Sequence, residues 1–214
     1  MTEFVLVRHG ETTWHEENRY AGRTDVSLTD RGRRQAELLG QWAAGADLTA
    51  VRTSPLGRCR DTGLLAATGT GLTPVADERL LELDFGDGEG LTAAEMTARF
   101  PDARAAFETD PVEHHLPGGE HPAHAVDRAV GCLADLAGAH PDGRVLVVGH
   151  STLNRLLLCH LLGIPLRQYR RTFPVVRNCA LTTLRWASTG TAALIELNRP
   201  VQDQPGSRTE QPRT

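Results

Sequence analysis

Two histidines and two arginines stand beside apolar segments from distant parts of the chain, and their types could handle phosphate: Arg8, His9, Arg58 and His150. A guanidinium group supplies positive charge and paired N–H donors that match a phosphoryl group. A neutral imidazole can attack phosphorus and accept that group. The four side chains therefore predict a site for an anionic phosphoryl group, provided that the fold brings them together.

The elements that must position these residues can be read from hydrophobic periodicity. Apolar segments typical of buried strands are 4–7, 48–52, 72–75, 144–148, 176–184 and 192–197. Helical patterns are found at 29–43, 54–69, 93–100, 120–139 and 151–162. Ser54 is predicted to cap the second helix and Ser151 the last one, because serine is a favoured N-cap residue.

Strands that alternate with helices predict an α/β fold, a three-layer sandwich whose mostly parallel central sheet carries helices on both faces. Ligands of such folds bind at the carboxyl ends of the strands. His9 and His150 each follow a predicted strand, and Arg58 lies on the first turn of the helix after another. The fold class thus brings the four side chains to one edge of the sheet.

The chain of 214 residues is predicted to form one domain over residues 1–198. Residues 76–119 have an irregular pattern rich in Gly, Pro and Asp, which indicates an insertion that covers one end of the sheet. Residues 199–214 are polar and lack apolar periodicity, which predicts a disordered tail.

Composition excludes several classes of function. A net charge of −4 and a pI of about 6.1 give no field that would draw the chain to nucleic acid or to an anionic membrane. No apolar run is long enough to span a bilayer, and the first residues do not resemble a secretory signal. A cytoplasmic location is the resulting expectation.

The cysteines point to packing and not to metal binding. Four are present, widely spaced and without a C-x-x-C pair: Cys59, Cys132, Cys159 and Cys179. Such spacing favours neither a zinc site nor a disulfide framework. They are expected to be buried core residues.

Five motifs then give a resemblance that covers residues 4 to about 197: Leu6–Thr12 (LVRHGET), Gly22–Gly32 (GRTDVSLTDRG), Ser54–Thr62 (SPLGRCRDT), Leu81–Gly90 (LELDFGDGEG) and Val148–Ser151 (VGHS). In this order they resemble the histidine phosphatase superfamily, which includes the cofactor-dependent phosphoglycerate mutases. The resemblance implies a phosphoglycerate mutase-like fold and an enzyme that needs neither metal nor other cofactor.

The resemblance also implies roles for individual residues. His9 would attack phosphorus and form a phosphohistidine, while Arg8, Arg58 and His150 would bind the phosphoryl oxygens. Glu82 would protonate the leaving group and then activate water. Asp84, Asp87 and Glu89 are nearby carboxylates that could compete for this role, and the register of the motif favours Glu82.

Two departures from the family pattern affect substrate binding. His15 follows Trp14 where many members carry an Asn that binds phosphate, so His15 either donates a hydrogen bond in its place or faces solvent. His121 replaces the Ser that usually follows the Pro-Gly-Gly-Glu segment, within a histidine-rich stretch at 114–124 whose spacing fits no strong metal-ligand pattern. The candidate substrate-binding residues are His15, Gly22, Arg23, His115, His121, Ser151 and Asn178.

The predicted function is metal-independent hydrolysis of a small phosphate ester through a phosphohistidine on His9. The sequence Asp84-Phe85-Gly86-Asp87 in the acid-bearing loop looks more like the phosphatase branch, which includes enzymes acting on sugar phosphates and the α-ribazole phosphatase of cobalamin synthesis. The alternatives are phosphoglycerate mutase-type transfer and a catalytically silent binding protein. Arg23 and the histidines could favour a substrate with a second anionic group, and a homodimer is a family-level expectation.

Overall fold

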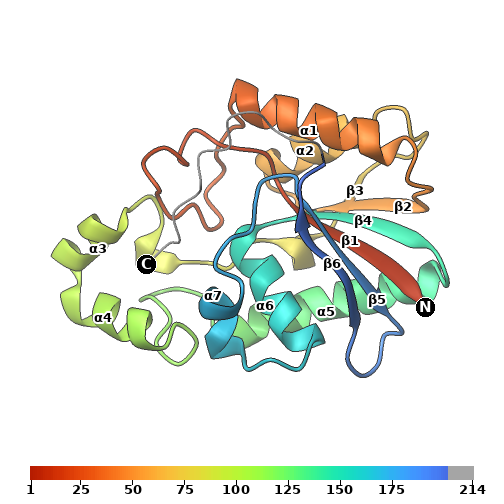
Figure 1. Cartoon of the computed structure of the whole chain (residues 1–214). Coiled ribbons are helices and arrows are strands. Elements are labelled where there is room, and N and C mark those ends of the chain that lie inside the picture. Colours follow the sequence, from red (N-terminus) through yellow and green to blue (C-terminus); the bar gives the residue numbers. More distant parts are fainter. Residues whose placement is uncertain (202–214) are drawn as a thin grey trace.

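A six-stranded β-sheet forms the middle layer of the protein in the computed structural model, which describes residues 1–201 (Figure 1). Its strands are β1 (Thr2–Arg8), β2 (Ala50–Thr53), β3 (Val75–Ala76), β4 (Arg144–Gly149), β5 (Leu181–Trp186) and β6 (Ala193–Arg199). The order across the sheet is β3-β2-β4-β1-β5-β6. Neighbours from β3 to β1 pair in parallel, whereas the β1–β5 and β5–β6 pairs are antiparallel.

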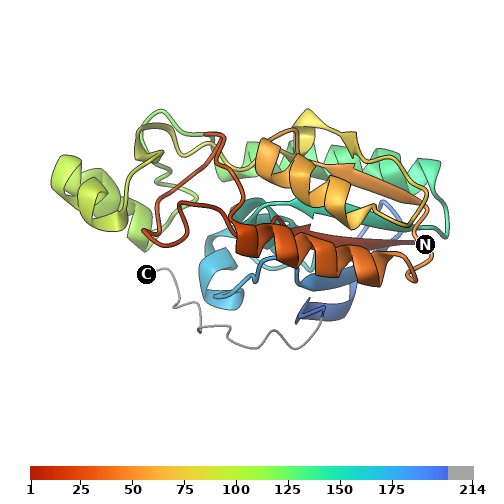
Figure 2. The ribbon, with the colours of Figure 1, turned by 90° about the horizontal axis from the view of Figure 1, so that it is seen from above.

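Helices cover both faces of this sheet. α1 (Asp30–Ala43) and α2 (Gly57–Ala66) lie on one face, and α5 (Pro122–Ala139) and α6 (Ser151–Leu161) lie on the other (Figure 1). Figure 2 shows α1 and α2 side by side over the sheet. The predicted three-layer α/β fold with a mostly parallel sheet is confirmed.

The hydrophobic core has two halves, one on each face. Successive side chains of a strand point to opposite faces, so Phe4 and Leu6 of β1 pack toward α5 and α6. Val5 and Val7 pack instead toward α1 and α2. All four are at most 1% exposed, which fixes the strand that ends at the predicted nucleophile. The four cysteines are free and buried, as expected.

Two predicted helix starts are wrong in detail. α2 begins at Gly57 and not beside Ser54, because the Ser54 N–H still donates to the Val148 carbonyl at the end of the sheet. The carboxylate of Asp25 instead accepts from the N–H of Gly57 and serves the helix end. In α6 the N-cap position is His150, and Ser151 is the first helical residue.

The irregular segment after β3 carries more helix than the sequence predicts. It contains the short 3₁₀ turns η1 (Glu78–Leu80) and η2 (Gly86–Gly88), then α3 (Ala93–Arg99) and the unpredicted α4 (Pro101–Thr109). Figures 1 and 2 show α3 and α4 beyond one end of the sheet. The buried Arg104 of α4 donates to the hydroxyl of Tyr20, which ties these helices to the loop after β1.

After α6 the chain runs through η3 (Leu166–Gln168) and α7 (Tyr169–Thr172) into β5. Residues 176–180 were predicted as strand but precede it, and within them Asn178 forms an isolated bridge with Arg8. β6 ends at Arg199, so the predicted tail cannot begin there, and its residues 202–214 lie outside the described part. Among residues 1–201 no helix has the length and apolar character that crossing a membrane requires. The division into one domain plus tail stays a prediction.

The core side chains of α5 give a test of this packing. Leu133 is 0% exposed, so Leu133→Ala should lower the free energy of unfolding by about 2–5 kcal/mol through lost burial and a residual cavity. Leu64 of α2 is 59% exposed, and Leu64→Ala should change it by less than about 0.5 kcal/mol. Urea unfolding of both variants measures the difference, and equal losses would contradict this view of the core.

Candidate active site

His9 sits directly after β1, and the backbone holds both its main chain and its ring. Its N–H donates to the Gly149 carbonyl at the end of β4. Ring atom Nδ1 lies 2.7 Å from the carbonyl oxygen of Gly10, which makes Nδ1 the protonated nitrogen of the neutral ring. The lone pair is therefore on Nε2, on the side of the ring away from that bond.

The surroundings of His9 keep this ring uncharged. Burial lowers the pKa of His9 well below 6.5, and the charge of Arg58, the nearby His150 and the charge of Arg8 lower it further. Only 6% of the residue is exposed. At neutral pH His9 is thus a neutral imidazole, which is the form that can attack phosphorus.

Arg58 is oriented by backbone carbonyls. Its Nη2 donates to Gly22 O at 2.6 Å and its Nη1 to Thr24 O at 2.7 Å. Its Nε is buried and has no hydrogen-bond partner in residues 1–201, so this N–H is available to a phosphoryl oxygen. The Arg8 side chain donates from Nη1 to the carbonyl of Val176 at 2.8 Å.

His150 packs against His9 with 5.4 Å between the ring centroids. It is fully buried at the N-terminal end of α6, and burial, followed by the charges of Arg58, Arg128 and Arg8, lowers its pKa well below 6.5. A neutral His150 can donate one hydrogen bond to an anion without adding a full charge to the site.

His15 faces the site and not solvent. Its Nε2 lies 2.6 Å from Nη2 of Arg8 and 3.3 Å from Nδ2 of Asn178, and its Nδ1 lies 3.0 Å from the Thr12 N. The Asn178 side chain also donates to the His9 carbonyl at 2.7 Å. These contacts place the His15 ring beside Arg8 in the cavity.

Glu82 is the one carboxylate of its loop that lines the same cavity. Its Oε1 accepts from the N–H groups of Leu83 and Leu153, both at 2.9 Å, and its Oε2 accepts from Thr152 N at 3.0 Å. The last two donors belong to the first turn of α6, so Glu82 and His150 are positioned by the same helix end.

The cavity collects most of the predicted residues. Seven of them line it: Arg8, His9, His15, Gly22, Arg58, Glu82 and Ser151. His150 and Asn178 lie directly against His9. The lining also contains five residues that were not predicted to bind substrate: Thr12, Trp14, Arg19, Ala21 and Phe85. Thr12 and Phe85 belong to the predicted motifs, whereas Trp14, Arg19 and Ala21 lie between two motifs, where proximity in sequence was the only available signal.

Besides Asn178, which contacts His9, three predicted substrate-binding residues do not line this cavity. Arg23 pairs with Glu120 at 3.3 Å and with Asp84 at 3.7 Å. His115 and His121 pack against each other with 5.5 Å between ring centroids. Across residues 1–201 no group of three or more His, Cys, Asp or Glu side chains is arranged to hold a metal ion.

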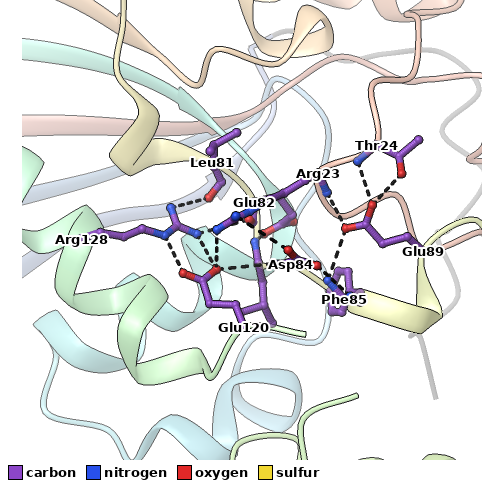
Figure 3. A network of polar contacts seen from close by, with 11 residues as sticks. Arg23, Thr24, Leu81, Glu82, Asp84, Phe85, Glu89, Glu120 and Arg128 are labelled. Atoms are coloured by element: carbon purple, nitrogen blue, oxygen red, sulfur yellow. Dashed lines mark hydrogen bonds and ion pairs between the residues drawn. The ribbon is translucent and has the colours of Figure 1, made fainter. Parts of the chain in front are cut away.

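Arg128 of α5 secures the loop that carries Glu82. It donates to the carbonyls of Arg79 and Leu81 at 2.8 and 2.7 Å and forms a two-pronged ion pair with Glu120 (Figure 3). Glu120 in turn binds Arg23, so one half-buried carboxylate joins α5 to the loop after β1.

Glu89 secures the turn that orients Arg58. Its carboxylate accepts from Arg23 N at 2.7 Å, from Thr24 N at 2.9 Å and from the Thr24 hydroxyl at 2.6 Å (Figure 3). Gly22 has a φ of +50° here, and a Cβ at that residue would lie 1.9 Å from a Glu89 oxygen. The carbonyls of Gly22 and Thr24 that hold Arg58 therefore depend on Glu89.

A neutral buried histidine beside two guanidinium groups, at the strand ends of an α/β sheet, is an arrangement for phosphoryl transfer. Comparison with known families agrees with this class. The model of the histidine phosphatase superfamily (branch 1) matches residues 4–198, and the chain belongs to that superfamily. The resemblance predicted from the five motifs is confirmed, and the chain is an enzyme of the phosphatase or phosphoryl-transfer type.

Two curated relatives carry names from the two activities of the superfamily. Phosphoserine phosphatase 1 of Hydrogenobacter thermophilus is 32% identical over 169 residues, which cover 79% of this chain and 80% of that protein. A probable phosphoglycerate mutase, GpmB of Cronobacter sakazakii, is 33% identical over 182 residues, which cover 85% of this chain and 84% of that protein.

Solved structures give the same fold. Bacillus stearothermophilus YhfR superposes with a TM-score of 0.87 at 28% identity and covers 94% of this chain and 100% of its own. A mycobacterial glucosyl-3-phosphoglycerate phosphatase complexed with VO3 gives 0.83 at 29% identity, over 92% of this chain and 98% of its own. A putative alpha-ribazole-5′-P phosphatase from Escherichia coli gives 0.83 at 25% identity, over 93% and 97%.

The dependence of Arg58 on Glu89 can be tested with Glu89→Gln. The amide loses one acceptor oxygen, so the turn at Arg23 and Thr24 should loosen and kcat/KM for a phosphate ester should fall about 10- to 100-fold. Asp87→Asn is the matched control, because Asp87 is an exposed carboxylate of the same loop. Equal activities of the two variants would show that Glu89 does not position Arg58.

The low pKa of His9 predicts a specific pH dependence of stability. Below pH 6.5 the unfolded state takes up a proton at this residue while the folded state does not, so stability is lost as the pH falls from 6.5 toward the folded-state pKa. His9→Asn should reduce the slope of unfolding free energy against pH by up to about 1.4 kcal/mol per pH unit. Denaturant unfolding between pH 5.5 and 8.5 measures it. Above pH 7.5 the slopes of wild type and His9→Asn should coincide. If the two slopes coincided at all pH values, the burial of a neutral His9 would be contradicted.

Proposed function

We propose that this chain is a phosphomonoesterase that needs no metal and hydrolyses a small phosphorylated metabolite through a phosphohistidine on His9. The observation that carries the proposal is the ring of His9, with Nδ1 on the Gly10 carbonyl and the Nε2 lone pair left for a phosphorus atom beside Arg8 and Arg58. The two arginines supply the positive charge that a metal ion supplies in other phosphatases.

In the first step Nε2 of His9 forms a bond to phosphorus while the bond to the leaving oxygen breaks. Arg8, Arg58 and His150 donate to the non-bridging oxygens and stabilise the charge that spreads over them. Glu82 gives its proton to the leaving oxygen, so the product is a neutral alcohol and Glu82 becomes a carboxylate.

In the second step Glu82 takes a proton from a water molecule, whose oxygen attacks the phosphorus. The bond from phosphorus to Nε2 breaks, and the free imidazole and inorganic phosphate are released. Glu82 is again protonated, so the enzyme returns to its starting state. The N–H groups of Thr152 and Leu153 hold the carboxyl group in place throughout.

The names of the related proteins and superposed structures favour hydrolysis over transfer. Phosphatase names occur among both the curated relatives and the superposed structures, whereas the mutase name is qualified as probable. Phosphoglycerate mutase-type transfer is the second candidate, because relatives of that name cover most of this chain. We further propose a cytoplasmic enzyme with a small phosphate ester as its partner, neither nucleic acid nor membrane, and a homodimeric state.

The test is phosphate release from a panel of phosphomonoesters in the presence of excess EDTA. Wild type should turn over, and His9→Ala should fall by at least about 10³-fold, since the nucleophile is lost. Wild type incubated with a ³²P-labelled ester and quenched in alkaline detergent should carry a base-stable, acid-labile phosphoramidate, and His9→Ala should not.

Loss of wild-type activity in EDTA would overturn the metal-free mechanism. Transfer to a second phosphoglycerate molecule without phosphate release would favour the mutase. An inert wild type that still binds phosphate esters would favour a silent binding protein.

A further inference from the structure

The outer part of the cavity contains an arginine whose charge is already compensated. Arg19 lines the cavity, and its Nε donates to Glu17 at 2.8 Å while Nη1 and Nη2 donate to the two oxygens of Glu95 at 2.7 and 3.2 Å. Nη1 also donates to the Gly90 carbonyl at 2.6 Å. Two carboxylates thus face one guanidinium group at the rim.

The second arginine near the rim is compensated in the same way. Arg23 follows the lining residue Gly22 and pairs with Glu120 and Asp84 (Figure 3). Glu120 is shared with Arg128, which is itself engaged by backbone carbonyls. Arg23 is therefore a link between loops and not a free cation that awaits an anionic substrate group.

The balance of charge differs between two parts of the cavity. We call the buried part around Arg8 and Arg58 the floor, and the partly exposed part around Trp14 and Arg19 the rim. Arg8 and Arg58 lie on the floor, where Glu82 is the one carboxylate that residues 1–201 contribute to the lining. The polar network behind Arg19 and Arg23 has two more carboxylates than guanidinium groups, and of its residues only Arg19 lines the cavity: Glu17, Asp84, Glu89, Glu95 and Glu120 against Arg19, Arg23 and Arg128. A second anionic group on the substrate would meet net negative charge there.

Three apolar residues also line the cavity. Trp14 and Phe85 line the cavity together with Ala21, and Trp14 is half-buried. The edge of the Trp14 ring lies next to Gly90. A Cβ atom added at Gly90 would lie 3.6 Å from Cη2 of Trp14. An aromatic side chain at this place offers a surface to an apolar or aromatic leaving group.

We propose that the enzyme selects phosphate esters whose leaving group is uncharged and presents an apolar or aromatic face, with Trp14 as the specificity-determining residue and the Glu17 and Glu95 pair as the charge filter. This inference rests on the proposed phosphatase activity. It runs against the expectation that Arg23 and the neighbouring histidines favour a second anion, because the cation of Arg23 is taken by Asp84 and Glu120.

The charge filter is tested with 4-carbamoylphenyl phosphate and 4-carboxyphenyl phosphate, which are nearly isosteric and differ by one negative charge. At pH 8 the phosphate of both esters is fully ionised, since its second pKa is about 6. Wild type should favour the amide in kcat/KM by about three- to tenfold, as expected for partly exposed charges. The ratio of two substrates on one enzyme does not depend on the folded fraction.

The double variant Glu17→Gln/Glu95→Gln should bring that ratio to within about twofold of unity. Glutamine can replace the Glu95 side chain in the capping box of α3, so the helix start is kept. Glu37→Gln is the matched control, because Glu37 is an exposed carboxylate of α1 outside the cavity. This control should leave the ratio of the two esters unchanged.

The aromatic surface is tested with benzyl phosphate against ethyl phosphate. Wild type should favour the benzyl ester, Trp14→Ala should reduce that preference about tenfold, and Trp14→Phe should retain most of it. A variant that merely destabilised the loop would lower both substrates together and leave the preference unchanged.

The outcomes separate this inference from the proposed function. If no ester releases phosphate, the phosphatase proposal falls, and the leaving-group inference falls with it. If all esters are hydrolysed but the carboxylate ester is preferred, only the leaving-group inference is overturned. The same holds if the double variant and Trp14→Ala leave both preferences as they are in wild type.

Discussion

The burial of two guanidinium groups beside two imidazoles is the constraint on which the rest of this structure depends. Arg8 and Arg58 are 5% and 1% exposed, and desolvated cations of this kind are costly unless their donors are satisfied. Backbone carbonyls of Gly22, Thr24 and Val176 provide most of the partners, and they carry no full charge. The positive field of Arg58 therefore stays available to a phosphate dianion, whereas a carboxylate partner would have cancelled it.

Because backbone carbonyls hold these arginines, the catalytic floor depends on the loops. The direction of a carbonyl group is set by the conformation of its backbone alone. The turn at Gly22 and Thr24 is held by Glu89, and the acid-bearing loop is held by Arg128 and the first turn of α6. Each support joins segments that are distant in sequence. Changes well outside the reacting atoms can thus displace them, and small displacements in such sites cost rate.

The sheet and the strand-end residues could be predicted from the sequence because they depend on local information. Apolar runs define β1 and β4, and a polar residue directly after a strand can only lie at its carboxyl end, as His9 and His150 do. Loop contacts were not predictable in this way. The start of α2 depends on Asp25, and the pairing of Arg23 with Glu120 spans 97 residues, so no periodicity signals either. The places of Trp14 and Arg19 in the cavity lining were missed for the same reason.

The separation of charge between floor and rim has a consequence for how the enzyme can discriminate. The floor arginines stabilise a bound phosphoryl group whatever leaving group it carries. They therefore strengthen binding but do not distinguish one leaving group from another. Discrimination must then come from the rim, where charges are partly exposed and each is worth little in water. Several carboxylates acting together with an aromatic surface can still produce a useful difference, because both act on the same part of the substrate. The fold thus assigns chemistry to the strand ends and selectivity to the irregular loops, which can vary without disturbing the core.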